Sequence, residues 1–309
     1  MTIFLILLVL AIAGVLGFSY FAYRIAFYSP VKGRAEPSGL KGAQYDPYQE
    51  VMGIIYHQLS DRPCEEVTIL SHDNLKLYGR YYHMKDGAPL DIGFHGYRSC
   101  CLRDFSGGSE ISFQRQHNLL LVDQRAHGKS EGSSITFGIQ ERYDCLDWIN
   151  YAVDRFGKEV KIMLYGISMG ASTVLMASAL DLPKNVKGII ADCPYSAPKK
   201  IIQKVCTEMR VSPALCYPFV AIGAKIFGGF DLEETDALQA VKHSSVPILI
   251  LHGEADSFVP CEMSEEIQNA CPDNVERHTF PDADHGISYL VDKDRYCKIV
   301  DDFLDNVLK

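Results

Sequence analysis

The feature that most constrains the fold of this chain is a serine bracketed by glycines between an apolar run and a helix-like run. Residues 160–165 are mostly apolar and lead directly into Gly166, Ser168 and Gly170. Residues 171–180 then repeat apolar side chains at helical spacing. Because the glycines let a strand and a helix approach without Cβ clashes, the pattern predicts a tight turn that exposes the Ser168 hydroxyl as a candidate nucleophile.

Short apolar runs alternate with helical segments through the rest of the chain. They are bounded by Gly, Asp and Pro, which is typical of strands covered on both faces. This alternation predicts an α/β fold with a mostly parallel sheet and helices on both faces. The predicted strands comprise a hairpin of residues 67–70 and 75–82, followed by residues 90–94, 119–122, 160–165, 186–191, 246–251 and 275–280.

Residues 197–243 interrupt this alternation. They are helical in pattern and unusually apolar, with Leu215, Phe219, Ile222 and Ile226 at helical spacing. Two interpretations stay open. The apolar face packs on the sheet edge, or the insert is a short helical lid whose apolar side lines a substrate pocket.

The N-terminus predicts a transmembrane helix. Residues 3–23 carry no charge, and at about 1.5 Å per residue they form about 31 Å of helix, close to one hydrocarbon thickness. A cleaved secretory signal is the alternative, but the run lacks a basic leader and a convincing cleavage site. Because basic flanks stay cytoplasmic, we expect a single-pass membrane protein with its catalytic domain in the cytoplasm. The basic residues after the run are Arg24, Lys32, Arg34 and Lys41.

We therefore divide the chain into an anchor (1–29), a linker with a short helix (30–64) and one domain (65–309) that contains the insert. The formal charge of -9 and the pI near 5.6 argue against a nucleic-acid partner. The ten cysteines show no zinc-type spacing, so we expect free thiols in a reducing compartment and no metal site.

A serine nucleophile needs a base and a group that orients the base. His285 follows the strand-like run 275–280, and loops at the carboxyl ends of strands hold the chemistry of such sheets. His127 is the main alternative. His95 and His252 also follow strands, but each opens a His-Gly turn, which favours a structural role.

Asp256 is the candidate acid. It leaves the carboxyl end of the predicted strand 246–251 and precedes His285 in the chain. Asp192, one strand earlier, is the substitute, whereas Asp284 is adjacent to the base and is expected to point away from it.

Acyl transfer also needs two donors for an oxyanion. The N–H of Met169 opens the helix after the serine, and the loop after residues 90–94 offers the N–H of Tyr97. We expect these two amides to form the oxyanion hole.

Together these motifs resemble the α/β-hydrolase family from about residue 65 to the end. Within it the chain is similar to the serine-aminopeptidase and prolyl-oligopeptidase-like branch, which also contains carboxylesterases and acyl thioesterases. The resemblance implies that Asp123 and Arg125 are structural loop residues. The segments that carry it are His95-Gly96-Tyr97, residues 121–130, 166–170 and 251–256, and Asp284-His285-Gly286.

The resemblance and the apolar N-terminal run together predict a membrane-anchored serine hydrolase that forms an acyl-serine at Ser168. We expect a small-molecule or lipid-like acyl substrate and no cofactor. An ester or thioester is favoured over an amide because the insert is short and apolar. A serine peptidase or aminopeptidase and a non-catalytic binding module remain the alternatives. The loop at Tyr97 lacks the extra glycines of the lipase-type loop, which places a bulky ring at the predicted pocket mouth.

Overall fold

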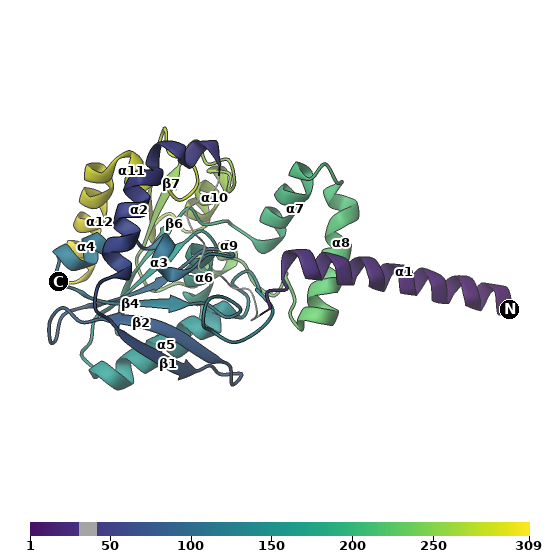
Figure 1. Ribbon diagram of the computed structural model, residues 1–309, viewed down its shortest axis with the longest axis horizontal. Coiled ribbons are helices and arrows are strands. Elements are labelled where there is room, and N and C mark those ends of the chain that lie inside the picture. The colour runs from purple at the N-terminus through teal and green to yellow at the C-terminus, as the bar shows by residue number, and fades with distance from the viewer. Residues whose placement is uncertain (31–41) are drawn as a thin grey trace.

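The computed structural model describes residues 1–30 and 42–309. An eight-stranded sheet lies at the centre of this part of the chain, with helices on both faces, and a long N-terminal helix projects away from the body (Figure 1). The basic positions Lys32, Arg34 and Lys41 lie outside the described residues. Each of the ten cysteines is a free thiol.

The strand order is β1-β2-β4-β3-β5-β6-β7-β8. The pairs β1–β2 and β2–β4 are antiparallel, and the other neighbours are parallel, as the sequence predicts for a mostly parallel sheet. The strands are β1 (Glu65–Leu70), β2 (Lys76–Tyr82), β3 (Leu90–Phe94), β4 (Asn118–Asp123), β5 (Ile162–Ile167), β6 (Val186–Asp192), β7 (Ile248–Gly253) and β8 (Val275–Phe280).

The register brings the carboxyl ends of the central strands level with one another. Phe94 at the end of β3 pairs with Gly166 of β5, and Ile167 of β5 pairs with Asp192 at the end of β6. Asp192 in turn pairs with Leu251 of β7. Loops that leave these strands therefore meet at one edge of the sheet.

Helices cover both faces because each presents one apolar stripe. On one face Trp148 and Val174 belong to the main core cluster, and on the other Phe303 packs with Met163. The helices are α1 (Thr2–Ala26), η1 (Ala43–Tyr48), α2 (Gln49–Ser60), α3 (Cys101–Asp104), α4 (Ser109–Gln114), α5 (Glu141–Phe156), α6 (Met169–Ala177), α7 (Pro198–Glu208), α8 (Pro213–Gly223), η2 (Ala224–Gly228), α9 (Ala237–Val241), α10 (Glu262–Ala270), α11 (Ser288–Val291) and α12 (Lys293–Val307).

The insert packs on α1, a contact that neither sequence-based interpretation included. Helix α8 packs against α1, and α7 packs against α8, away from the main body (Figure 1). A Cβ at Gly223 of α8 would lie 2.4 Å from the carbonyl oxygen of Ser19, so the missing side chain allows the close approach of the two helices. Aromatic contacts extend this packing, with the ring centroids of Phe18 and Phe219 5.8 Å apart.

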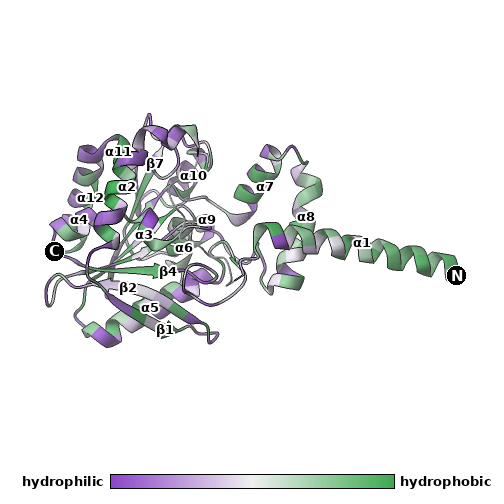
Figure 2. Cartoon of the chain, viewed as in Figure 1, coloured by the Kyte–Doolittle hydropathy of each residue, from purple (hydrophilic) through white to green (hydrophobic). Residues whose placement is uncertain are grey.

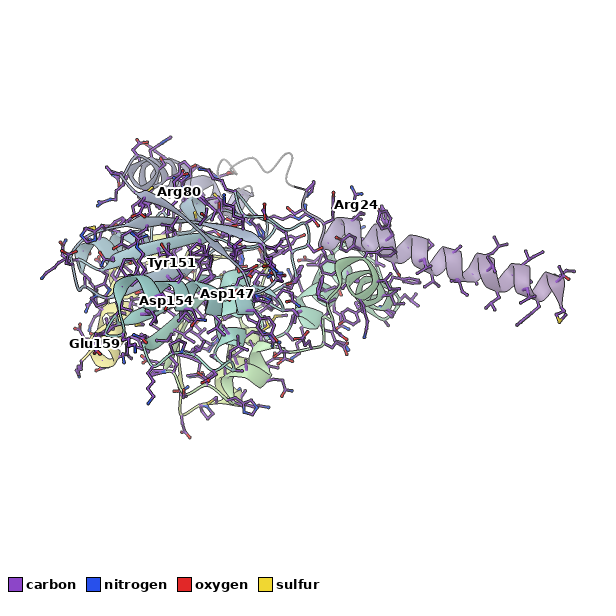
Figure 3. The ribbon with its side chains drawn as sticks, turned by 90° about the horizontal axis from the view of Figure 1, so that it is seen from below. Arg24, Arg80, Asp147, Tyr151, Asp154 and Glu159 are labelled. Atoms are coloured by element: carbon purple, nitrogen blue, oxygen red, sulfur yellow. The ribbon has the colours of Figure 1, made fainter. Side chains whose placement is uncertain are left out.

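Helix α1 is apolar over most of its length (Figure 2). It is long and apolar enough to cross a membrane, with a mean hydropathy of 2.7 over its most apolar window and only 6% of that window buried. Arg24 lies at the end of α1 nearest the body (Figure 3), where its guanidinium sits 4.2 Å from the centroid of the Tyr28 ring. Beyond it, the N–H of Ser29 donates to the carbonyl of Ser133 and ties the helix to the body.

Candidate active site

Ser168 occupies a strained turn between β5 and α6. Its φ of 55° and ψ of −115° lie outside the regions that residues with a side chain prefer. A Cβ at Gly166 would lie 2.3 Å from the carbonyl oxygen of Gly170, and one at Gly170 would lie 1.9 Å from that of Phe94. Both positions therefore require glycine, and the turn is held by the packing of strand against helix.

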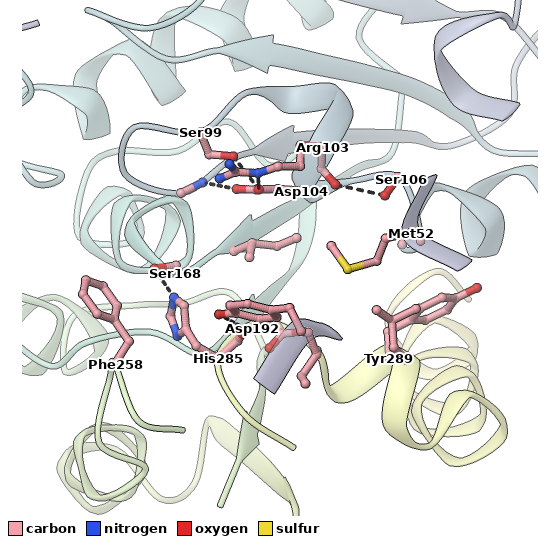
Figure 4. A pocket seen from close by; sticks show the side chains of 18 of the residues that line it. Met52, Ser99, Arg103, Asp104, Ser106, Ser168, Asp192, Phe258, His285 and Tyr289 are labelled. Carbon is pink, nitrogen blue, oxygen red and sulfur yellow. Dashed lines mark hydrogen bonds and ion pairs between the residues drawn. The ribbon is translucent and has the colours of Figure 1, made fainter. Parts of the chain in front are cut away.

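The structure brings Ser168, His285 and Asp256 together, and the contact between Ser168 and His285 is drawn in Figure 4. His285 Nε2 lies 2.9 Å from Ser168 Oγ, and His285 Nδ1 lies 2.7 Å from Asp256 Oδ2. With the proton on Nδ1, the ring donates to the carboxylate and accepts from the hydroxyl. This arrangement permits the imidazole to remove the serine proton while the carboxylate stabilises the imidazolium that forms.

The carboxylate of Asp256 is buried and accepts several hydrogen bonds. The backbone N–H groups of Phe258 and Val259 donate to Oδ1 at 2.9 and 2.7 Å. Burial alone would raise the pKa of Asp256, but hydrogen bonds from His252 and His285 outweigh burial and hold this pKa well below its usual value. The carboxylate therefore stays ionised at neutral pH.

The other histidines after strands are engaged in loop contacts. The N–H of Arg98 donates to His127 Nε2 at 2.9 Å, and the N–H of Gln124 donates to His95 Nε2 at 3.1 Å. His252 is fully buried beside the acid, with its Nε2 3.2 Å from Asp256 Oδ2. The sequence analysis did not predict this second imidazole on the acid.

The other acids have separate partners. Asp192 is buried and accepts a 2.8 Å hydrogen bond from Tyr296, and burial raises the pKa of Asp192 to about 6 despite this bond. The carboxylate of Asp284 accepts from the N–H of Ser257 at 2.9 Å and from the backbone N–H of His285 at 2.6 Å. Neither of these two bonds involves the imidazole of His285.

The loop after β3 lies against the serine. A Cβ at Gly96 would lie 3.3 Å from the Cβ of Ser168. Asp104 on α3 holds this loop, because its Oδ2 accepts from the N–H of Gly96 at 2.7 Å and its other oxygen accepts from Ser99 (Figure 4). The sequence analysis missed Asp104, since no local pattern marks an acid in a short helix several residues beyond the loop.

The same loop forms hydrogen bonds with the C-terminal end of α1 and the residues that follow it. Arg98 donates to the carbonyl oxygens of Ile25 at 2.9 Å and Tyr28 at 3.2 Å, and the Tyr97 hydroxyl donates to that of Ala26 at 2.8 Å. The sequence predicts the ring of Tyr97 at the pocket mouth. In the structure this side chain links the candidate oxyanion loop to the N-terminal helix.

Among the residues that the structure describes, two groups of side chains have donor atoms close enough to hold a metal ion. In the first, Cys193 joins Asp256 and His285, but burial raises the pKa of the Cys193 thiol well above its usual value, so it is a neutral, poor ligand. In the second, Asp73 and Asp144 join His72. Both of these carboxylates already bind the guanidinium of Arg125, in keeping with the structural role that the resemblance implies for this arginine.

Comparisons with known proteins agree with the fold. The family model described as alpha/beta hydrolase fold matches residues 104–213. The esterase Pf2001 of Pyrococcus furiosus superposes with a TM-score of 0.66 over 82% of this chain and 96% of that protein, at 24% identity. The strand order, the strained turn at the serine and these matches together show that the chain has the α/β-hydrolase fold.

Curated relatives are more distant. The Uncharacterized protein YqkD of Bacillus subtilis is 25% identical over 62% of this chain and 63% of its own length, so the match spans less than two thirds of that relative. The Lysophosphatidylserine lipase ABHD12 of Danio rerio is 26% identical over 49% of this chain and 38% of its own length. The named relatives thus include an esterase and a lipase.

Proposed function

We propose that this protein is a membrane-anchored serine hydrolase that cleaves carboxylic ester or thioester bonds through an acyl-serine intermediate. The observation that carries the proposal is the continuous chain of hydrogen bonds from Ser168 through His285 to Asp256. Three side chains in this order have the geometry needed to convert a weak alcohol nucleophile into a reactive one.

In the first half of the reaction, the Ser168 oxygen attacks the acyl carbon while its proton passes to His285 Nε2. The N–H groups of Tyr97 and Met169 would hold the resulting oxyanion. The bond from the acyl carbon to the leaving oxygen or sulfur then breaks, and the leaving group takes the proton from His285. In the second half, water attacks the acyl-serine with His285 as its base, which releases a carboxylic acid and restores the serine.

The choice of bond rests on the surroundings of Ser168. The wall on the insert side is apolar, with Ile202, Val205 and Phe219 among the residues that line it. An acyl group fits such a wall, whereas a peptide amine or carboxylate would need a charged partner there. The esterase and lipase relatives support the same choice.

The proposed anchor is α1, with the catalytic domain on the cytoplasmic side. Its length and hydropathy support a membrane span. A reporter enzyme fused after Lys309 that works only in the external compartment tests this orientation. We expect no reporter activity, and a fully active reporter would reverse the orientation.

The chemistry is tested with the full-length protein and a short-chain fluorophosphonate probe, with Ser168→Ala as the control. We expect the probe to label the native protein and not the variant. A panel of p-nitrophenyl esters, thioesters and aminoacyl anilides then assigns the bond. Absence of labelling would support a binding module, and faster turnover of the anilides would support a peptidase.

A further inference from the structure

Two cavities of different character meet at Ser168. One is a cavity of about 550 Å³ whose lining includes Met169 and apolar side chains of α1, α7 and α8. The other is a cavity of about 390 Å³ whose lining includes His285, Arg103 and Ser99 (Figure 4). The serine therefore lies where an apolar chamber joins a chamber lined by both polar and apolar side chains.

The chemistry assigns one half of the substrate to each chamber. The leaving group must lie near His285, which returns its proton, and His285 lines the polar cavity. The acyl carbon binds Ser168, and the rest of the acyl group extends past Met169 into the apolar cavity. The acyl part is therefore apolar, whereas the leaving group can place polar atoms beside Arg103 and Ser99.

Helix α1 forms one wall of the apolar cavity. Phe18, Phe21, Ala22, Ile25 and Ala26 all line it, opposite residues of α7 and α8. From the first to the last of these residues the helix rises about 12 Å. The cavity therefore follows the helix from the serine toward its membrane-inserting part, so an acyl chain in it would run alongside α1.

Exposed apolar side chains mark where this cavity opens to the surface. Leu215 is 70% exposed, Met209 59% and Phe18 67%, and all three line the cavity. Exposed apolar groups gathered around an opening are unfavourable in water and favourable against lipid. Because the residues of α1 before Phe18 project away from the body (Figure 1), this opening lies where the helix would enter a bilayer.

We infer that the cavity between α1 and helices α7 and α8 is the binding site for one long acyl chain, which enters from the bilayer along α1, while its polar leaving group occupies the cavity beside His285. The inference rests on the proposed acyl-serine function and names its substrate class, a single-chain ester or thioester lipid with a hydrophilic leaving group. It also makes the N-terminal helix part of the substrate site as well as an anchor.

The proposed acyl-chain site is tested by narrowing the apolar cavity from two sides. Ala22→Trp fills the cavity from α1 and Val205→Trp fills it from α7, since both side chains line it. Ala13→Trp, on the exposed part of the same helix, is the matched control. The readout is the ratio of kcat/KM for palmitoyl and butyryl p-nitrophenyl esters, measured on the full-length protein in phosphatidylcholine vesicles.

We expect Ala22→Trp and Val205→Trp to lower this ratio by about tenfold or more, because each excluded methylene loses the free energy of its burial. Ala13→Trp should leave the ratio unchanged. An unchanged ratio in both cavity variants, each still labelled by a short-chain fluorophosphonate, would overturn the inference. If the native protein neither binds this probe nor hydrolyses the butyryl ester, the proposed function itself fails.

The route of entry is tested with the native protein in vesicles. A palmitoyl ester of a hydrophilic fluorogenic alcohol is placed either in the same vesicles as the protein or in separate ones. We expect hydrolysis to be at least about tenfold faster in the shared bilayer, because the chain then reaches the cavity without crossing water. Equal rates in the two arrangements would contradict entry from the bilayer.

Discussion

The hydroxyl of Tyr97 donates a 2.8 Å hydrogen bond to the carbonyl oxygen of Ala26, which lies 71 residues earlier in the chain. Tyr97 belongs to the loop that we propose supplies one N–H of the oxyanion hole, and Ala26 is the last residue of the N-terminal helix. Arg98 reinforces the contact through the carbonyls of Ile25 and Tyr28. The position of the N-terminal helix and the geometry of the catalytic loop are thereby coupled.

Tyr97→Phe is expected to lower kcat about fivefold with little change in KM. The variant keeps the ring and the backbone N–H and loses a hydrogen bond worth about 1 kcal/mol, so the loop loses positional order that matters only in the transition state. Steady-state kinetics on butyryl p-nitrophenyl ester measure this effect. Tyr20→Phe removes a hydroxyl that interacts with Arg24 on the same helix and serves as the control. Equal kcat values in both variants would argue against the coupling.

Asp104→Ala is expected to lower kcat about tenfold or more. The N–H of Gly96 would lose its acceptor, and the loop would move away from Ser168. Asp104→Asn keeps one oxygen acceptor and should restore part of the loss. Thermal unfolding of both variants separates a positioning effect from general destabilisation. If alanine and asparagine variants have the same kcat, the hydrogen bond to Gly96 is not the cause.

Asp256→Asn is expected to lower kcat by about 10⁴-fold, because an amide favours the wrong tautomer of His285 and leaves the imidazolium without a counter-charge. Asp282→Asn, at an exposed carboxyl in the same loop as His285, is the matched control and should be close to native. A loss below tenfold in Asp256→Asn would point to Asp192 as the functional acid.

The pH dependence of stability follows from Asp192. Burial raises the pKa of Asp192 to about 6, whereas an unfolded aspartate titrates near ~3.9. Between these values the folded state binds more protons than the unfolded state, so the free energy of unfolding falls as pH rises. Relative to Asp192→Asn, the native protein should lose about 3 kcal/mol between about pH 4 and about pH 7.

Urea unfolding of the full-length protein in detergent, at several pH values, measures this difference. Using the difference between native protein and variant removes the contributions of all other titrating groups. A difference that stays constant with pH would show that Asp192 remains ionised in the folded state throughout.

Most of the sheet could be predicted from the sequence, because strand and helix periods are local properties. The predicted strands at residues 90–94 and 275–280 coincide with β3 and β8. The strand before Ser168 is shifted toward the turn, at Ile162–Ile167, because the pairing with β3 and β6 continues to Gly166 and Ile167. Apolar residues alone cannot locate the end of a strand that runs into a tight turn.

Candidate catalytic positions were also visible in the sequence, since in a parallel sheet every strand delivers its following loop to the same edge. Ser168, Asp256 and His285 each follow a strand, and this position in the chain is enough to predict that their side chains lie close together. Nothing local marks Asp104 as the acceptor for Gly96 or His252 as the second imidazole at the acid. Those contacts depend on which loops meet in space.

The sequence by itself determined the order of strands and helices, the strained turn at Ser168 and an apolar N-terminal helix. Only the tertiary structure decided that this helix packs on α8, that Tyr97 bonds to Ala26, and that two unlike cavities meet at the serine. Periodicity reports which face of an element is buried, but not which distant element covers it. That pairing depends on loop paths and side-chain shapes across the whole chain, which no single segment encodes.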